Sequence, residues 1–262
     1  MAQVARFFFC IASAAIAVSA SAQSAFNGTW HTDLSKSKLS TKPNVFYLSQ
    51  GWYHCVSCNP TYNVKADGTD QPVTGQAYDT VSVKEEDAKT ISVTAKKAGA
   101  VDFEQTRTVS ADGKTLTVKT TVHPPNSAQP VTAEVTATLS GVAPSGVHAA
   151  SGAWVIAKLK QSDNGLDTTY KIEGDQITMT QPTGESYTAK LDGTDAPYKG
   201  SNSTDTVSVK KIDAHTIEET DKRGGEVTEV DKITVAANGK TMTVVATSKR
   251  TDRTSTYVAT KK

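Results

Sequence analysis

Net charge, aromatic residues and cysteine are all scarce in this sequence of 262 residues. Its 28 Lys and Arg residues nearly balance 27 Asp and Glu residues, which leaves a formal net charge of +1. A neutral surface with interspersed charges creates no field that would attract nucleic acid or an acidic bilayer. We therefore expect no nucleic-acid partner and no attraction to a membrane surface.

Sequence motifs of common enzymes are missing as well. The chain has no Gly-x-Ser-x-Gly elbow, no His-Glu-x-x-His motif and no phosphate-binding loop. Its five histidines lack the short spacing of metal-ligand pairs: His31, His54, His123, His148 and His215. We therefore predict no catalytic residues, no metal and no cofactor, and an enzyme ranks behind the two non-catalytic hypotheses given below.

A long apolar run occurs only near the N-terminus. Arg6 precedes the apolar residues 7–18, and Ala20 and Ala22 form a small-x-small cleavage motif. This order is typical of a secretory signal peptide, which we assign to residues 1–22. The apolar run of about a dozen residues is too short to span a bilayer. We therefore expect an exported protein, periplasmic or extracellular, without a membrane span.

Two halves of the chain repeat each other at an offset of about 125 residues, which indicates an internal duplication. Three pairs of blocks match best: residues 62–70 with 187–195, 79–84 with 205–210, and 111–118 with 237–244. A stretch rich in Gly, Pro and Ser separates the two halves. We predict a first β-barrel repeat over residues 23–140, a linker over residues 141–149 and a second β-barrel repeat over residues 150–262.

Each repeat has the pattern of a series of short strands. Thr and Val are frequent, and both are β-branched residues that favour an extended backbone. Asp-Gly and similar turn signals separate the strands so closely that only antiparallel neighbours can be joined. Val207 and Val209 alternate with polar residues, which predicts one buried and one wet face. We predict an all-β fold of two tandem antiparallel up-and-down barrels, with open β-sandwiches as the alternative.

Acidic side chains occur at expected strand ends and turns. The pairs at residues 85–86 and 218–219 are interpreted as solvated strand ends. Asp67 and Asp192 precede glycine in turns, where Asp forms local hydrogen bonds and tolerates left-handed conformations. We therefore assign these acids to the surface and to turns rather than to a calcium site.

Each repeat opens with Gly-x-Trp, at Gly28 and Trp30 in the first copy and at Gly152 and Trp154 in the second. This opening, followed by many short strands, resembles the calycin superfamily of lipocalins and fatty-acid-binding proteins. The resemblance implies an up-and-down barrel in each repeat and makes these four residues part of the barrel floors. An eight-stranded barrel has an interior that holds side chains or one small ligand.

Cys55 and Cys58 form a Cys-x-x-Cys pair that the second repeat lacks. Alignment of the repeats through Tyr62 and Tyr187 places this pair at a hairpin tip. Export into an oxidising compartment favours a disulfide between the two cysteines. A metal site with His54 needs further ligands that no second cluster supplies, and redox chemistry needs a thioredoxin-like context that is missing. Both alternatives stay open at the level of sequence.

Four aromatic residues adjoin this tip: Phe46, Tyr47, Trp52 and Tyr53. They form either the lip of a cavity or part of the barrel wall, and we take them as candidate ligand-binding residues. The first functional hypothesis is an exported, non-catalytic binding protein that holds a small apolar or amphipathic ligand inside a barrel. The alternative is a structural or protein-interaction module of the cell envelope, with an envelope protein as partner and no small-molecule ligand.

Overall fold

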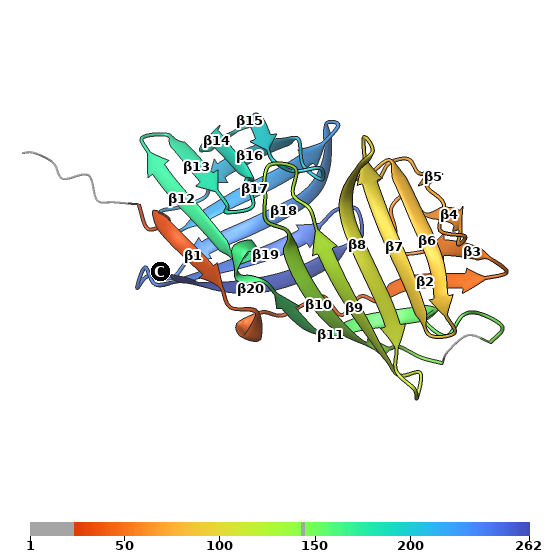
Figure 1. Cartoon of the computed structure of the whole chain (residues 1–262). Coiled ribbons are helices and arrows are strands. Elements are labelled where there is room, and N and C mark those ends of the chain that lie inside the picture. Colours follow the sequence, from red (N-terminus) through yellow and green to blue (C-terminus); the bar gives the residue numbers. More distant parts are fainter. Residues whose placement is uncertain (1–23, 143–144) are drawn as a thin grey trace, which may run out of the picture.

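The computed structural model describes residues 24–142 and 145–262 (Figure 1). The predicted signal peptide, residues 1–22, lies outside the described residues, as do residues 143–144 of the predicted linker. The described part of the chain is almost entirely β, with twenty strands and two single-turn 3-10 helices. Neither of these helices is long and apolar enough to cross a membrane.

The strands form two sheets of ten strands each, which we call barrel one and barrel two (Figure 1). Barrel two is closed, and its neighbouring strands are in order β1 (Gly28–Thr32), β12 (Asp167–Glu173), β13 (Gln176–Thr180), β14 (Ser186–Lys190), β15 (Asp192–Lys199), β16 (Thr206–Lys211), β17 (Thr216–Arg223), β18 (Glu226–Val235), β19 (Thr241–Ser248) and β20 (Arg253–Lys261). Barrel one is nearly closed, and its order is β4 (Tyr62–Lys65), β3 (Trp52–Cys55), β2 (Asn44–Ser49), β11 (Gly152–Gln161), β10 (Val131–Leu139), β9 (Thr115–Val122), β8 (Ala100–Val109), β7 (Thr90–Lys97), β6 (Thr80–Asp87) and β5 (Gln71–Pro72).

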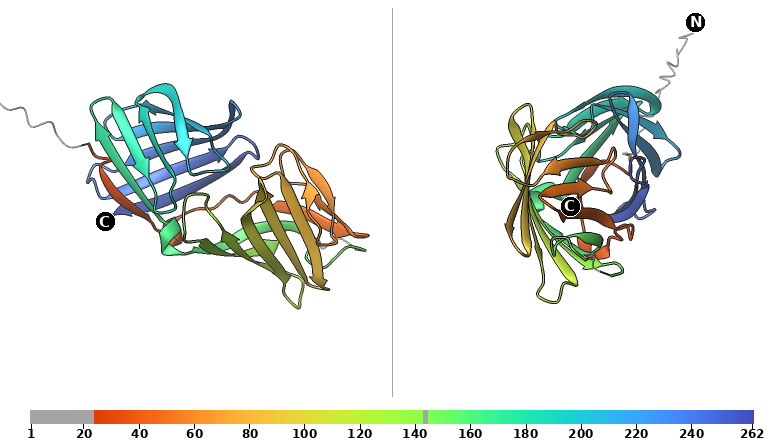
Figure 2. Two further views of the ribbon diagram at one scale, coloured as in Figure 1. Left: turned by 45° about the horizontal axis from the view of Figure 1, so that its top comes forward. Right: turned by 90° about the vertical axis from the view of Figure 1, so that its right-hand side faces the viewer.

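Neighbouring strands pair antiparallel in both sheets, and the two barrels lie side by side (Figure 2). Within β16, Val207 and Val209 are buried and Lys210 is exposed, which confirms the predicted alternation of faces. The prediction of an all-β fold with up-and-down barrels is confirmed.

The first strand of each repeat lies in the barrel of the other repeat. β1 pairs with β12 and β20 of barrel two, where Trp30 lies opposite Lys261. β11 pairs with β10 and β2 of barrel one, where Trp154 lies opposite Asn44. In Figure 1, β1 is the red-orange strand between the green-turquoise β12 and the dark blue β20 of barrel two. The two repeats have therefore exchanged their first strands within one chain.

The exchange differs from the predicted division at residues 141–149, which kept each first strand with the rest of its own repeat. The prediction missed the exchange because the duplication gives both repeats a similar first strand. Gly28 lies opposite Tyr170 in barrel two, and Gly152 lies opposite Phe46 in barrel one, so the two first strands occupy equivalent positions. Both first strands have the same Gly-x-Trp opening, so local sequence does not show which barrel each one joins. The predicted linker consequently joins two neighbouring strands of one barrel, β10 and β11.

The chain crosses between the barrels in the segments that follow β1 and β11. Each crossing contains one 3-10 turn, η1 (Leu34–Lys36) in the first and η2 (Asp163–Gly165) in the second. The Asp33 carboxylate caps η1 by accepting a hydrogen bond from the backbone amide of Ser35 at 3.0 Å.

Each barrel has its own hydrophobic core around an exchanged tryptophan. Trp30 and Trp154 are both 1% exposed. Each indole N–H donates to the backbone carbonyl four residues earlier, at 2.8 Å to Phe26 and at 2.9 Å to Ala150. A buried indole donor thus has its partner within the same short segment, which satisfies the group without an added polar side chain.

The glycines of the two Gly-x-Trp openings have positive φ angles, 130° at Gly28 and 149° at Gly152. A Cβ atom on Gly152 would lie 2.6 Å from Leu139 Cδ1 on the neighbouring strand. Glycine is required here by its backbone conformation and by the close approach of the next strand.

Candidate ligand-binding site

A cavity of about 440 Å³ lies inside barrel one. Its wall is formed by side chains of β2, β3, β8, β9, β10 and β11. Most of the wall is apolar and includes Phe46, Leu116, Val118, Val135, Ala137, Trp154 and Ile156. A largely apolar concavity of this volume is typical of small-molecule sites.

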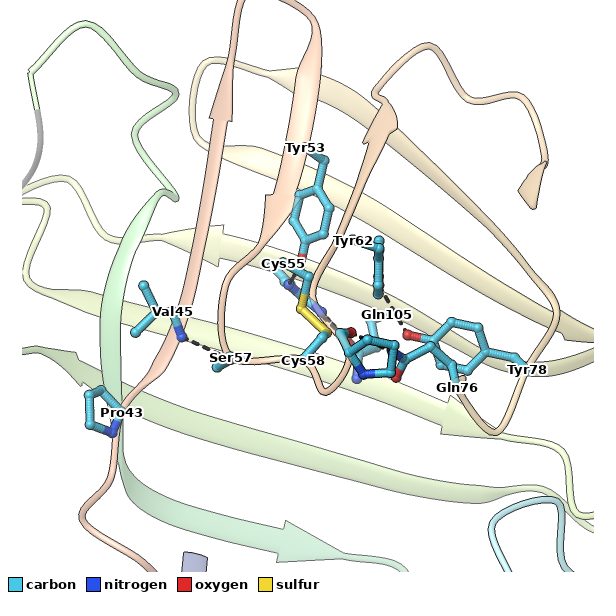
Figure 3. Close-up of a disulfide and its surroundings, with 12 residues drawn as sticks. Pro43, Val45, Tyr53, Cys55, Ser57, Cys58, Tyr62, Gln76, Tyr78 and Gln105 are labelled. Carbon is cyan, nitrogen blue, oxygen red and sulfur yellow. Dashed lines mark hydrogen bonds between the residues drawn. A yellow bond between two sulfur atoms is a disulfide. The ribbon is translucent and has the colours of Figure 1, made fainter. Parts of the chain in front are cut away.

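Five aromatic rings form a continuous row in the core of barrel one. Successive ring centroids lie 5.7 Å (Phe46–Tyr53), 6.3 Å (Tyr53–Tyr62), 6.5 Å (Tyr62–Tyr78) and 5.5 Å (Tyr78–Phe103) apart. These separations suit tilted and edge-to-face contacts. Tyr62 and Tyr78 also share a hydrogen bond of 3.0 Å between their hydroxyls (Figure 3). Burial raises the pKa of both hydroxyls, so both stay neutral.

Arg107, on β8, places a positive charge in this largely apolar cavity. Its Nη1 donates to Tyr53 Oη at 2.8 Å, and its Nε and Nη2 donate to Gln105 Oε1 at 3.1 and 2.7 Å. Its guanidinium carbon lies 4.8 Å from the centroid of the Phe46 ring, which is a cation–π contact.

The Arg107 guanidinium has no acidic partner. No carboxylate of the described residues lies within 4.0 Å of it. A guanidinium has five N–H donors, and the hydrogen bonds to Tyr53 and Gln105 use three of them. Two donors of the guanidinium therefore have no hydrogen-bond partner among the described residues.

The structure separates the four aromatic residues that the sequence nominated for ligand binding. Phe46 and Tyr53 are buried and line the cavity. Tyr47 and Trp52 are not part of the lining, and Trp52 is 43% exposed. Successive side chains of a strand point to opposite faces of the sheet. Adjacency in sequence therefore grouped residues that lie on opposite sides of the barrel wall.

The tryptophans assigned to the barrel floors belong to the opposite barrels from those expected. Trp154 of the second repeat lines the cavity in barrel one. Trp30 of the first repeat packs in the core of barrel two, where the Lys261 ammonium lies 5.0 Å from the centroid of its ring. The exchange of first strands is the reason for both placements.

Sequence reasoning did not select Arg107, although comparison of the repeats contains a signal. Arg107 lies opposite Ile91 on β7, whereas the equivalent pair in barrel two is Ile233 opposite Ile217. Arginine at an inward position that takes isoleucine in the other copy indicates a local requirement for charge.

The predicted disulfide between Cys55 and Cys58 is confirmed (Figure 3). Cys55 ends β3, Cys58 lies in the loop that follows, and both line the cavity. Ser57 Oγ accepts a hydrogen bond from the backbone amide of Val45 at 3.1 Å, which holds this loop against β2. The bridged sulfurs are not free thiolates, so in this state they do not act as metal ligands. In the described ranges, no three His, Cys, Asp or Glu residues are grouped to hold a metal ion.

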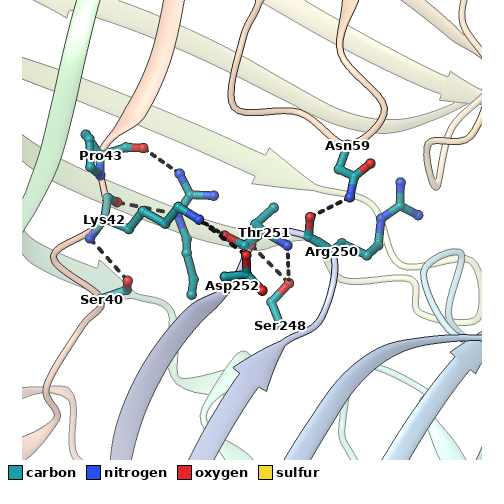
Figure 4. Close-up of polar contacts among 9 residues, drawn as sticks. Ser40, Lys42, Pro43, Asn59, Ser248, Arg250, Thr251 and Asp252 are labelled. Carbon is teal, nitrogen blue, oxygen red and sulfur yellow. Dashed lines mark hydrogen bonds and ion pairs between the residues drawn. The ribbon is translucent and has the colours of Figure 1, made fainter.

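Barrel two completes the mouth of the cavity. The turn between β19 and β20 contributes Ser248, Arg250 and Thr251 to the lining. Asn59 Nδ2 donates to the Arg250 carbonyl at 2.5 Å, and Lys42 Nζ donates to the Thr251 carbonyl at 2.6 Å (Figure 4). The mouth therefore lies between the disulfide loop of barrel one and a turn of barrel two.

Barrel two has an interior of the opposite character, with four largely buried carboxyl groups on two adjacent strands. Glu219 on β17 lies opposite Asp231 on β18, and Asp221 lies opposite Glu229. The equivalent positions of barrel one hold Val93, Gln105, Ala95 and Phe103. In the part of the chain that the structure describes, no lysine, arginine or histidine lies within ion-pair distance of the four carboxyls.

Burial decides the protonation of these groups. Glu219 is 8% exposed and accepts a hydrogen bond from the Tyr187 hydroxyl at 2.5 Å. Burial raises the pKa of Glu219 to about 8, that of Asp221 to about 7 and that of Asp231 to about 9. Asp221 Oδ1 and Asp231 Oδ1 are buried without a hydrogen-bond partner among the described residues. At neutral pH, Glu219 and Asp231 are therefore largely protonated.

The interpretation of residues 218–219 as a solvated pair is wrong for Glu219. Glu218 is exposed, and Glu219, as the next residue of β17, points to the opposite face and is buried. Two adjacent glutamates look the same in sequence whether both are solvated or one points inward. The pair alone therefore could not show that Glu219 is buried.

No protein-family model matches this chain, and no curated protein is significantly similar to it in sequence. The fold and the cavity define a class: a duplicated antiparallel β-barrel protein whose first barrel has a cationic, largely apolar cavity. The fold is consistent with the barrel type that the calycin resemblance implies, and no family match assigns the chain to that superfamily.

Proposed function

We propose that this protein is a non-catalytic binding protein that holds a small amphipathic anion in the cavity of barrel one. The observation that carries the proposal is Arg107, a guanidinium without an acidic partner in a largely apolar cavity. A carboxylate or similar acidic head group accepts its two free N–H donors. The apolar part of the ligand packs against Leu116, Val118 and Trp154.

Both parts of such a ligand favour binding. A hydrogen bond to a charged group contributes about 1.5–3 kcal/mol, and each buried methylene adds about 0.8 kcal/mol. Lost translational and rotational freedom offsets part of this gain. A ligand of medium chain length then reaches a dissociation constant on the order of micromolar, about −8 kcal/mol.

Barrel two does not suit the same ligand. Its carboxyl groups take the positions of Val93, Ala95 and Phe103, and Ile233 takes that of Arg107. An anionic head group there would meet acidic side chains without a cation. The proposal therefore assigns the binding function to one of the two barrels.

The alternative function, a structural or interaction module of the cell envelope, requires no ligand and leaves the interiors to side chains. The cavity of about 440 Å³ with an unpaired cation favours the binding function over this alternative. We further propose that the protein is exported, as the predicted signal peptide and the Cys55–Cys58 disulfide together suggest.

Native mass spectrometry of the protein from its own host tests export and ligand binding together. The expected chain mass corresponds to a start at Gln23, with additional bound mass that is lost after extraction with organic solvent. A chain that retains residues 1–22 contradicts export. A chain without bound mass contradicts ligand binding and favours the alternative function as a structural or interaction module.

The variant Arg107→Gln tests the head-group site with decanoate as the probe. We expect decanoate affinity, measured by calorimetry, to fall about 10- to 100-fold, because a charge-assisted hydrogen bond is lost. Lys119→Gln is the matched control, since it removes one positive charge from the exposed face of β9 in the same barrel. Equal affinities in the Arg107→Gln variant and the wild type would contradict the proposal, provided that both proteins have the same melting temperature.

A further inference from the structure

Two arginines of barrel two converge on one backbone oxygen of barrel one. Arg223, at the end of β17, and Arg250, in the turn between β19 and β20, both donate to the carbonyl oxygen of Gly75. The distances from their Nη2 atoms to this oxygen are 2.7 and 2.6 Å. Two positive groups are thus held side by side at the seam between the barrels.

This pair has no acidic partner in the described residues. Neither guanidinium lies within 4.0 Å of a carboxylate. The acid nearest in sequence to Arg250 is Asp252, which is 87% exposed and pairs with Lys42 instead, at 3.8 Å. Like charges at short distance repel each other, and one carbonyl oxygen carries only a partial negative charge. An anion between the two guanidiniums would remove this repulsion.

The backbone of the turn that carries Arg250 is held in place. Asn59 and Lys42 fix the backbone of the turn through the carbonyls of Arg250 and Thr251 (Figure 4). In the same view the Arg250 guanidinium points away from Asp252. A guanidinium with one hydrogen bond has further N–H donors directed outward, so the seam offers preorganised donors for an anion.

Arg250 also connects this seam to the cavity of barrel one. It lines the same cavity as Arg107, and Gln76, the neighbour of Gly75, lines it too. The cavity thus has one cation within its wall, on β8, and a second cationic group at its mouth. The two charges come from different repeats, so neither repeat alone forms both ends of the site.

We propose that the ligand of barrel one carries two acidic groups separated by an apolar segment, one bound by Arg107 and the other by Arg223 and Arg250. This inference rests on the proposed binding function and extends it to the ligand class: amphipathic dianions such as α,ω-dicarboxylates. Arg223 and Arg250 are specificity-determining residues that favour the dianion over the monoanion.

Calorimetry with two probes of equal chain length, decanoate and decanedioate, tests the inference on the full chain. We expect decanedioate to bind about tenfold more tightly than decanoate, because it adds a charge-assisted contact. The double variant Arg223→Gln, Arg250→Gln should abolish this difference, with the affinity for decanedioate falling about tenfold relative to that for decanoate. Lys249→Gln is the matched control, since it removes one exposed charge next to Arg250 and should preserve the difference.

The outcomes separate this inference from the proposed function. If decanoate binds and decanedioate binds no better, the dianion inference is overturned and the binding function stands. If the preference persists in the double variant, Arg223 and Arg250 are not its source and the inference is overturned. If neither probe binds the folded wild type, the proposed function fails and the inference fails with it. A second double variant, Arg223→Lys with Arg250→Lys, keeps both charges and should retain part of the preference.

Discussion

The two barrels have the same strand arrangement, but substitutions at a few inward positions give their interiors different charges. Barrel one has Arg107 where barrel two has Ile233, and Gln105 where barrel two has Asp231. Arginine carries a permanent positive charge in proteins. A buried carboxyl instead takes up a proton, since burial disfavours its charged form. One barrel thus has a permanent charge, and the other has a charge that depends on pH.

At this residue scale we expect the free energy of unfolding to fall as the pH rises from about 5 to about 9. In the unfolded chain these carboxyls have pKa values near 4 and are ionised across this range. In the folded chain, pKa values of about 8 for Glu219 and about 9 for Asp231 retain protons. Folding takes up protons, so this stability is complete at low pH and is lost as the pH rises through the folded values. Each proton contributes up to about 1.4 kcal/mol per pH unit.

Urea unfolding at constant ionic strength measures this dependence in the wild type and in Glu219→Gln. Glutamine keeps an acceptor for the Tyr187 hydroxyl and cannot ionise, so the variant should show a shallower slope. Glu218→Gln is the control, because Glu218 is the exposed neighbour on the same strand. A level stability between pH 5 and pH 9 in the wild type would show that the buried carboxyls do not retain protons.

At the scale of elements, the loop between β3 and β4 joins three features of the molecule. The Cys55–Cys58 disulfide closes the loop on itself, and Ser57 holds it against β2. Asn59 links it to the Arg250 carbonyl of barrel two. The loop therefore shapes the cavity mouth and contacts the neighbouring barrel at the same time.

We expect the double variant Cys55→Ser, Cys58→Ser to lose only about 1–2 kcal/mol of unfolding free energy, because the bridged loop is short. Its decanoate affinity should fall several-fold, since the loop is then less firmly held at the mouth. Urea unfolding and calorimetry measure the two effects. Reductant added to the wild type should reproduce both effects and leave the variant unchanged. Wild-type affinity in the variant would mean that the disulfide has no part in shaping the site.

The strand pattern and the disulfide could be predicted from sequence because both depend on local signals. Asp-Gly turns and alternating valines define hairpins without knowledge of the rest of the chain. The inward direction of Arg107 depends on the register of β8, and the role of Arg250 depends on contact between two barrels. Neither is a local property, so residue patterns alone could not select them. The prediction for Glu219 was wrong because the acidic pair alone does not show which face of β17 points inward, where Glu219 lies between Val209 and Asp231 of the adjacent strands.

At the scale of the whole molecule, the exchanged first strands make each barrel depend on both repeats. Barrel one contains β11 between β10 and β2, and barrel two contains β1 between β12 and β20. The segment between β10 and β11, which the sequence presents as a boundary between domains, is a connection within barrel one. The boundaries of the sequence repeat and of the barrels therefore differ.

We expect the chain to remain one particle after cleavage between β10 and β11. With a protease site inserted at residues 141–146, the two fragments should elute together from a size-exclusion column in native buffer, because each has a strand in the barrel of the other. The same fragments should separate in concentrated urea, which is the control for complete cleavage. Separate elution in native buffer would contradict the exchange.

The exchange also determines how the chain responds to mechanical tension. β1 and β20 are antiparallel neighbours, with Trp30 opposite Lys261 and Thr32 opposite Ala259, so both ends of the folded chain leave barrel two on the same side. A force that draws the two ends apart acts on this seam in the unzipping direction, where hydrogen bonds break one after another instead of together. Barrel one carries no tension until β1 has peeled away. Barrel two is therefore expected to open before barrel one when the two ends of the chain are pulled apart, so barrel one and its cavity stay folded at first.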